Sequence, residues 1–170
     1  NLLGELYDDT FLDKSLKDVD VVIHAAALTR STNKKKLYNS NELITKKLIK
    51  YCEKNNISKF IFLSTDLANN PVGNYGKSKL ACENLVKDSK IKDWIILRLS
   101  PVIFSTKGDP RTTFGKMFQS IENKNLIFLP NSGNFNVSPL LACDLLEIIK
   151  NIIDFKKTIK EILPVKGKEY

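Results

Sequence analysis

Three short, predominantly apolar runs constrain the fold of this chain more than any other feature of its sequence. They cover Asp20–Ala27 (DVVIHAAA), Phe60–Leu63 (FIFL) and Trp94–Leu99 (WIILRL). Runs of this length and composition predict strands, and strands that are apolar at consecutive positions lie inside a parallel sheet with both faces covered. A helical pattern over Asn41–Lys54 separates the first two runs. Alternating strands and helices predict an α/β fold, a doubly wound parallel sheet with helices on both faces.

Other segments carry weaker patterns. The helical spacing of apolar residues predicts three more helices, over Phe11–Leu16, Phe114–Ile121 and Leu140–Ile153. The run Leu126–Leu129 predicts a short strand, residues 28–36 predict a loop, and the tail from Phe155 supports no prediction. No internal repeat or second domain is visible, so we expect one domain over residues 1–170.

The formal net charge of +8 raises the question of an acidic partner. Surfaces that bind nucleic acid combine clustered Lys and Arg with aromatic platforms. Here only Lys34–Lys36 form a basic run, and the other lysines are interspersed with Asp and Glu. We therefore predict no nucleic-acid partner and assign the lysines to the solvated surface, where they can attract an anionic nucleotide.

Membrane, secretion and metal-binding signals are not found in the sequence. No apolar run approaches the ~20 residues of a membrane helix, so no membrane association is expected. The chain starts Asn1-Leu2-Leu3 without a signal peptide, which favours a cytoplasmic location. Its three cysteines lie far apart without the spacing of metal ligands, so we expect reduced thiols and no metal: Cys52, Cys82 and Cys143.

One stretch combines side chains suited to proton transfer. Thr65 and Asp66 follow the strand Phe60–Leu63, and after a turn a helix carries Tyr75 and Lys79. Residues four apart on a helix share a face. A phenol titrates near ~10, and a nearby ammonium lowers its pKa. We predict that Tyr75, tuned by Lys79, exchanges a proton with a substrate oxygen that Thr65 hydrogen-bonds.

Structural roles are the alternative for these residues. Tyr75 can simply pack, and Lys79 can pair with Glu83 one helical turn further on. His24 is the one histidine of the sequence. It lies within an apolar run, so we predict a hydrogen-bonded core histidine rather than a catalytic one.

The segment YGKSK (Tyr75–Lys79) after FLST (Phe62–Thr65) resembles the extended short-chain dehydrogenase/reductases, in particular the NAD-dependent epimerases and dehydratases of nucleotide sugars. The resemblance runs from about Gly4 to Asp144. It implies a Rossmann-like sheet, NAD or NADP as cofactor and a nucleotide-sugar substrate. It also implies four catalytic residues: Thr65, Asp66, Tyr75 and Lys79.

The same resemblance implies a set of cofactor contacts along the chain. In the family, the positions of Glu5 and Leu6 lie at the adenine, and those of Ala25–Ala27 lie where the dinucleotide approaches the backbone closely. The other positions lie around the ribose and nicotinamide. The implied residues are Glu5, Leu6, Ala25, Ala26, Ala27, Asn41, Leu63, Ser64, Tyr75, Lys79, Leu99, Ser100, Pro101 and Val102. For Asn41, a plain N-terminal helix cap is an equal alternative.

Two departures from the family pattern matter. The sequence contains no G-x-x-G-x-x-G loop, which holds the pyrophosphate at a helix N-terminus in this family. We therefore expect a partial domain that lacks the N-terminal strands, with residues 100–170 contributing to the substrate side. In the dehydratases a Lys or Glu that transfers protons follows the Asp, whereas here that position is Leu67.

The sequence leaves the reaction partly open. Because Leu67 cannot transfer a proton, we predict epimerisation or keto-group reduction over dehydration. A carbonyl reductase of the steroid or flavonoid type would use the same residues. A regulator or assembly subunit that binds NAD(P) without catalysis is the other alternative, although such relatives often lose the Tyr or the Lys. The exact substrate, NAD versus NADP and the oligomeric state, including a homodimer, are not decided by any residue.

Overall fold

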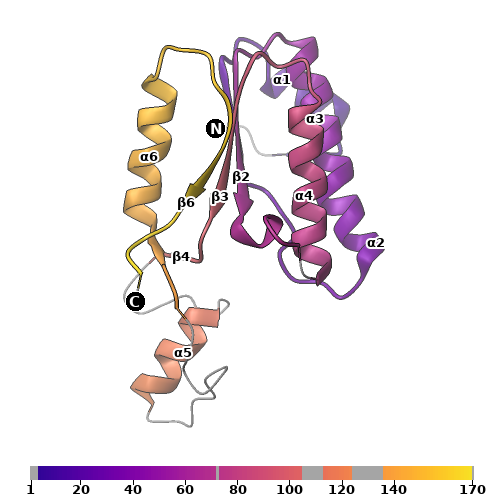
Figure 1. Ribbon diagram of the computed structural model, residues 1–170. Helices are drawn as coiled ribbons and strands as arrows, with labels where there is room; N and C mark the ends of the chain where they lie inside the picture. The colour runs from indigo at the N-terminus through magenta and orange to yellow at the C-terminus, as the bar shows by residue number, and fades with distance from the viewer. Residues whose placement is uncertain (1–3, 72, 105–112, 124–135, 170) are drawn as a thin grey trace. The chain divides into compact units, whose positions relative to one another are not determined.

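The computed structural model describes residues 4–71, 73–104, 113–123 and 136–169 (Figure 1). The chain divides into two compact units. The first unit comprises Asn1–Arg98 and Lys156–Pro164, and the second comprises Leu99–Phe155 and Val165–Tyr170. The predicted active-site stretch lies entirely in the first unit.

The main sheet has the strand order β1-β2-β3-β6. Its strands are β1 (Val21–His24), β2 (Lys59–Thr65), β3 (Asp93–Leu99) and β6 (Lys160–Val165). Strands β1 and β2 pair in parallel, with Val21 opposite Lys59 and His24 opposite Phe62. The amides of Trp94 and Ser100 donate to the carbonyls of Ile159 and Val165, so β3 and β6 also run in the same direction. The predicted parallel α/β sheet is confirmed.

The first unit carries its helices in the order α1 (Asp9–Ser15), α2 (Lys34–Leu37), the π-helical turn η1 (Tyr38–Leu43), α3 (Ile44–Lys54), the 3-10 turn η2 (Asp66–Ala68) and α4 (Gly73–Lys87). Helix α4 packs against β2, α3 and both turns. The helix α1 begins where the Asp8 carboxylate accepts hydrogen bonds from the amides of Thr10 and Phe11. This cap satisfies backbone donors that a helix N-terminus leaves free.

The core of the first unit lies between the sheet and these helices. Phe60 and Phe62 of β2 and Ile96 of β3 pack with the apolar residues of α3 and α4, including Cys52 and Val86, all fully buried. On the other face of these strands a further set of side chains is also completely buried: Ile61, Ile95 and Leu97. Burial on both faces explains why these strands are continuously apolar in the sequence.

The described residues of the second unit form a two-stranded parallel pair and two helices. Strand β4 (Val102–Ile103) pairs with β5 (Leu140–Leu141). Helix α5 covers Thr113–Glu122, and α6 covers Ala142–Asp154 with Leu145 and Ile149 buried.

Several predicted boundaries were wrong. The strand expected to reach Ala27 ends at His24, and the expected loop 28–36 already contains the start of α2. The tail from Phe155, for which nothing was predicted, supplies β6. Its sequence KEILPV mixes two charges and a proline with apolar residues, as is common where a strand closes a sheet. The predicted strand Leu126–Leu129 lies outside the described residues.

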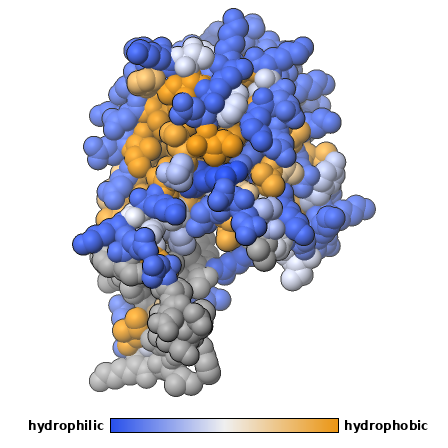
Figure 2. All heavy atoms as spheres, in the orientation of Figure 1, coloured by the Kyte–Doolittle hydropathy of each residue, from blue (hydrophilic) through white to orange (hydrophobic). Residues whose placement is uncertain are grey.

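Exposed lysines account for the net charge. Three of them, Lys46, Lys50 and Lys54, lie on the outer side of α3. Figure 2 shows mainly hydrophilic residues on the surface over α3 and α4, at the right of the view. Among the described residues, no helix is long and apolar enough to cross a bilayer.

Candidate active site

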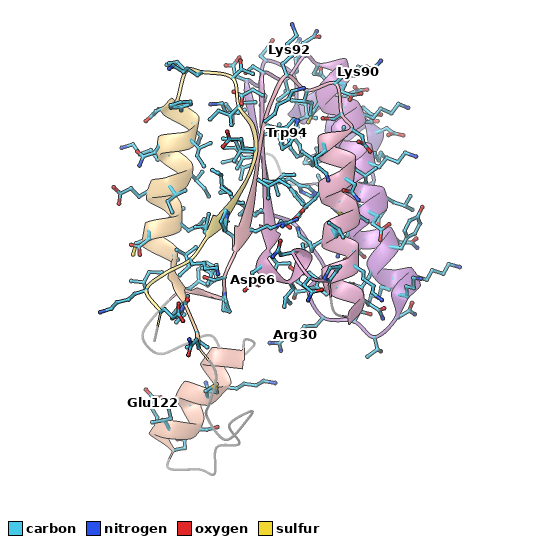
Figure 3. All side chains as sticks on the ribbon, viewed as in Figure 1. Arg30, Asp66, Lys90, Lys92, Trp94 and Glu122 are labelled. Carbon is cyan, nitrogen blue, oxygen red and sulfur yellow. The ribbon has the colours of Figure 1, made fainter. Side chains whose placement is uncertain are left out.

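The four predicted catalytic residues come from three consecutive elements. Thr65 ends β2, Asp66 begins η2, and Tyr75 and Lys79 lie in the first two turns of α4. Figure 3 shows Asp66 at the carboxyl end of the strands, the end opposite to Lys90 and Lys92. Ligands of doubly wound sheets bind at this end.

Lys79 reaches from α4 to the end of β2. Its Nζ donates a hydrogen bond of 2.7 Å to the Leu63 carbonyl oxygen and lies 3.9 Å from the centroid of the Phe62 ring. The side chain is buried, and burial lowers the pKa of the Lys79 ammonium to about 8, although Cys82 and Glu83 act in the opposite direction. The alternative pairing of Lys79 with Glu83 is not formed as a salt bridge, because Glu83 pairs with an arginine described below.

Tyr75 is half-buried beside Asp66. Burial is the main cause that raises the pKa of the Tyr75 phenol, and the charges of Cys82 and Asp66 raise it further. The predicted lowering of the Tyr75 pKa by Lys79 is therefore wrong. Burial destabilises the phenolate, and the Lys79 ammonium is engaged at the Leu63 carbonyl. At neutral pH Tyr75 holds its proton, which suits donation to a carbonyl oxygen.

Thr65 and Asp66 interact directly. The Thr65 hydroxyl donates to Asp66 Oδ1 at 3.2 Å and accepts a weaker bond from the Leu67 amide at 3.4 Å, which caps η2. Gly76 allows α4 to approach this turn, since a Cβ atom at Gly76 would lie 2.7 Å from the Leu67 carbonyl oxygen. The Leu67 side chain is half exposed.

Asn41 joins two parts of the predicted site. It lies buried within η1, so the interpretation as an N-terminal cap is wrong. Its side-chain amide bonds both the amide and the carbonyl of Leu28, at 2.8 and 3.1 Å, and donates to Ser78 Oγ at 3.0 Å. Ser78 in turn donates to the Tyr75 carbonyl oxygen at 2.9 Å. Asn41 thus links the segment after β1 to the helical turn that carries Tyr75.

His24 is a core residue, as predicted. Its side chain is buried, and Nε2 lies 2.9 Å from Thr45 Oγ1. Thr45 also contacts Cys82 Sγ at 3.5 Å. Burial, with a smaller contribution from Lys79, lowers the pKa of His24 to about 4, so the ring is neutral at physiological pH.

The remaining predicted cofactor residues fall into three groups. Glu5 is exposed, and Leu6 packs against the core of the first unit. Ala25 and Ala26 are exposed and Ala27 partly exposed directly after β1, while Ser64 is buried at the end of β2. The last group, Leu99, Ser100, Pro101 and Val102, lies in the second unit, where the buried Ser100 Oγ has no hydrogen-bond partner among the described residues.

Sequence reasoning missed a polar cluster beside the predicted catalytic residues. The Arg98 Nη2 atom lies 2.7 Å from Glu83 Oε2 in an ion pair whose carboxylate is completely buried. Glu83 Oε1 accepts a 2.6 Å bond from Ser64 Oγ, and Arg98 Nη1 donates to Asn69 Oδ1 at 2.7 Å. The available signal was Arg98 itself, the only charged residue inside the apolar run WIILRL.

Comparison with known proteins decides the family. The sequence model of the family described as polysaccharide biosynthesis protein matches residues 1–104, more than half of the chain. The chain belongs to this family.

Relatives of this polysaccharide biosynthesis family member include named enzymes. A UDP-N-acetylglucosamine 4,6-dehydratase (inverting) from Campylobacter jejuni is 39% identical over 89 residues, which cover 49% of this chain and 26% of the relative. A UDP-glucose 4-epimerase from Rickettsia bellii is 34% identical over 87 residues, which cover 49% of this chain and 26% of the relative. The predicted relationship to the nucleotide-sugar group of extended short-chain dehydrogenase/reductases is confirmed.

The fold of this family member matches solved structures over nearly its full length. The UDP-glucuronic acid 4-epimerase from Bacillus cereus, crystallised with UDP-glucuronic acid and NAD, superposes with a TM-score of 0.84 at 23% identity. The match covers 97% of this chain and 59% of the epimerase. The chain therefore spans little more than half of that enzyme and matches only about a quarter of the two sequence relatives.

Proposed function

We propose that the protein is an NAD-dependent enzyme of the nucleotide-sugar epimerase/dehydratase type that acts through a keto intermediate. The placement of Tyr75 and Lys79 carries this proposal. Both lie in the first turns of α4 at the carboxyl end of β2, and the Lys79 ammonium is held at the Leu63 carbonyl. The adjacent Thr65 and Asp66 supply a hydroxyl and a carboxylate. Relatives named as UDP-sugar dehydratase and epimerase support the substrate class.

The described residues fit a dinucleotide cofactor. Ala25 and Ala26 expose only methyl groups after β1, which permits the close approach of a ligand, and the buried Ser100 hydroxyl has no partner among the described residues. Within the first unit, Ala25–Ala27 and Lys79 would hold the cofactor, with Glu5 and Leu6 at the adenine. The chemistry that bound NAD would supply is the reversible removal of hydride from a sugar carbon. We favour NAD over NADP because the structural neighbours were crystallised with NAD.

Each catalytic side chain has a distinct task in this proposal. In the oxidising step the phenolate form of the half-buried Tyr75 takes the proton from the sugar hydroxyl, and in the reducing step the resulting phenol returns a proton to the oxygen of the keto sugar. Thr65 hydrogen-bonds the same oxygen. Lys79 holds the cofactor ribose. Asp66 accepts a hydrogen bond from the Thr65 hydroxyl and its charge acts on Tyr75, so its carboxylate can serve as a second proton acceptor.

The proposed reaction is epimerisation or keto-group reduction. Elimination of water requires an acid for the leaving hydroxyl and a base for the neighbouring carbon. Leu67 can supply neither, so Asp66 alone would have to serve both steps. Dehydration is the second candidate, because the Campylobacter jejuni relative is named as a 4,6-dehydratase. A cytoplasmic location, a homodimer and the contribution of residues 100–170 to the substrate side remain parts of the proposal.

Product analysis tests this function. The full-length protein is incubated with NAD and, separately, UDP-N-acetylglucosamine, UDP-glucose and UDP-glucuronic acid, with a Tyr75→Phe variant as control. An epimer of unchanged mass, identified by chromatography and NMR, is the expected product, and the control should form none. If none of these three UDP-sugars is converted while NAD still binds, the non-catalytic alternative replaces this proposal.

A further inference from the structure

Glu83 forms the centre of a buried polar cluster on α4. It follows Tyr75 and Lys79 at successive four-residue steps, and its side chain is completely buried. Its carboxylate accepts hydrogen bonds from Ser64 Oγ at 2.6 Å, from Arg98 Nη2 at 2.7 Å and from Arg98 Nε at 3.1 Å. A buried carboxylate with one arginine and one hydroxyl partner has a fixed orientation, because its lone pairs are used within the protein.

Arg98 extends this cluster to the turn after β2. Two of its nitrogens face Glu83, and the third, Nη1, donates to Asn69 Oδ1 at 2.7 Å. The guanidinium is planar and rigid, so the direction of the Asn69 bond is set by the pairing with Glu83. Arg98 keeps its charge throughout, because hydrogen bonding to Glu83 raises its pKa. We call these residues, Ser64, Asn69, Glu83 and Arg98, the clamp.

Two residues of the clamp flank the short segment that contains Thr65 and Asp66. Ser64 immediately precedes Thr65, and Asn69 lies three residues after Asp66. Within the segment, the Asn69 amide donates to the Asp66 carbonyl at 3.0 Å, so a bond on the Asn69 side chain restrains the turn that carries Asp66. The other end of the clamp, Glu83, belongs to the helix of Tyr75.

We propose that Arg98 and Asn69 are positioning residues, which fix Thr65 and Asp66 against Tyr75 by tying the turn after β2 to α4. This inference rests on the proposed function, because it assigns these residues to turnover. Misplacement of a reacting group by about 1 Å can cost on the order of 100-fold in rate. A single hydrogen bond at the exposed Asn69 can therefore influence turnover while contributing little to the stability of the core.

A set of Asn69 variants separates positioning from stability. Asn69→Leu keeps the size of the side chain and removes the acceptor, whereas Asn69→Asp retains an acceptor for Arg98 and serves as the conservative rescue. In the full-length protein we expect Asn69→Leu to lower kcat about tenfold with KM and NAD affinity unchanged, and Asn69→Asp to stay within about twofold of the wild type. The thermal unfolding midpoints of both variants should match that of the wild type.

Hydrogen exchange provides a readout that does not require turnover. In Asn69→Leu the amides of Leu67 and Asn69, bonded to Thr65 Oγ1 and the Asp66 carbonyl, should exchange faster, while those of β3 should not change. Arg98→Lys is a second variant, since a lysine can pair with Glu83 but cannot also reach Asn69 in the fork geometry. It should reproduce the exchange pattern of Asn69→Leu.

Three results would contradict the positioning role of Arg98 and Asn69. Full kcat in Asn69→Leu, a loss that appears in KM instead of kcat, or unchanged exchange at Leu67 and Asn69 would each overturn the positioning role. If the wild type converts no nucleotide sugar, the proposed function fails and the assignment to turnover fails with it. In that case faster exchange in Asn69→Leu would still establish the clamp as the restraint on Thr65 and Asp66.

Discussion

The Lys79 ammonium lies 2.7 Å from the Leu63 carbonyl oxygen and 3.9 Å from the centre of the Phe62 ring. The lysine therefore reaches across to the end of β2 instead of along its own helix to Glu83. This contact places a buried cation at the carboxyl end of the sheet, one helical turn from Tyr75. Thr65 and Asp66 follow Leu63 directly, so the contact also ties α4 to the strand that supplies them.

Tyr75→Phe tests the proton-transfer assignment. The phenylalanine keeps the packing of the ring and removes the hydroxyl, so turnover should fall on the order of 100-fold or more while NAD(H) affinity stays nearly unchanged. Steady-state rates and a fluorescence titration of NADH on the full-length protein provide the measurement. Tyr38→Phe, at an exposed tyrosine, is the matched control. Wild-type turnover in Tyr75→Phe would remove Tyr75 from the mechanism.

The buried Lys79 predicts a specific dependence of stability on pH. Its pKa is about 8 in the folded protein and 10.5 in the unfolded chain, so the unfolded state binds more protons between these values. Stability contributed by this site should therefore rise as pH increases from 8 to 10.5, by up to about 3 kcal/mol.

Urea unfolding of the wild type and Lys79→Met across this pH range measures the effect. The wild type should gain stability relative to the methionine variant as pH rises, because methionine does not titrate. Lys77→Met removes an exposed lysine of the same helix and should leave the pH profile unchanged. Parallel pH profiles for the wild type and Lys79→Met would show that the ammonium is not held in a desolvated position.

Gly76→Ala tests the contact between α4 and the η2 turn. Alanine favours a helix by about 1 kcal/mol over glycine, whereas overpacking costs about 1 to 3 kcal/mol. The neighbour at 2.7 Å is the backbone oxygen of Leu67, which cannot move without shifting the turn. We therefore expect net destabilisation by up to about 2 kcal/mol in chemical unfolding and reduced turnover. Lys77→Ala is the control, and a more stable Gly76→Ala variant would contradict the close approach.

Leu67→Lys tests the expectation that the protein does not eliminate water because Leu67 cannot transfer a proton. The wild type is expected to form no 4-keto-6-deoxy sugar from UDP-N-acetylglucosamine. The side chain of Leu67 is half exposed, so a lysine at this position can transfer a proton, and the Leu67→Lys variant is expected to form this product. Mass spectrometry would detect the product by its loss of water. Accumulation of this product by the wild type would mean that another residue performs the task, and a Leu67→Met variant controls for the change in side-chain length.

The amino-acid pattern was sufficient to predict the parallel sheet and the helix that carries Tyr75 and Lys79. The runs around Phe60 and Trp94 are apolar at consecutive positions, and this local pattern predicts buried parallel strands without knowledge of their partners. Helical periodicity alone likewise predicts that Tyr75 and Lys79, four residues apart, lie on the same face of their helix. His24 could be assigned to the core because it lies within such a run, and the structure buries it beside Thr45.

The hydrogen-bond partners of the polar side chains could not be predicted before the fold was known. Asn41 bonds Leu28 and Ser78, which lie 13 and 37 residues away, so its role depends on contacts that no local pattern contains. The same holds for Arg98, whose partners lie on α4 and in the turn after β2. The raised pKa of Tyr75 depends mainly on burial, which is a property of the assembled fold and which the helical spacing of Tyr75 and Lys79 does not reveal. Hydrophobic periodicity is encoded locally, whereas hydrogen-bond partners and desolvation arise only when distant segments pack together.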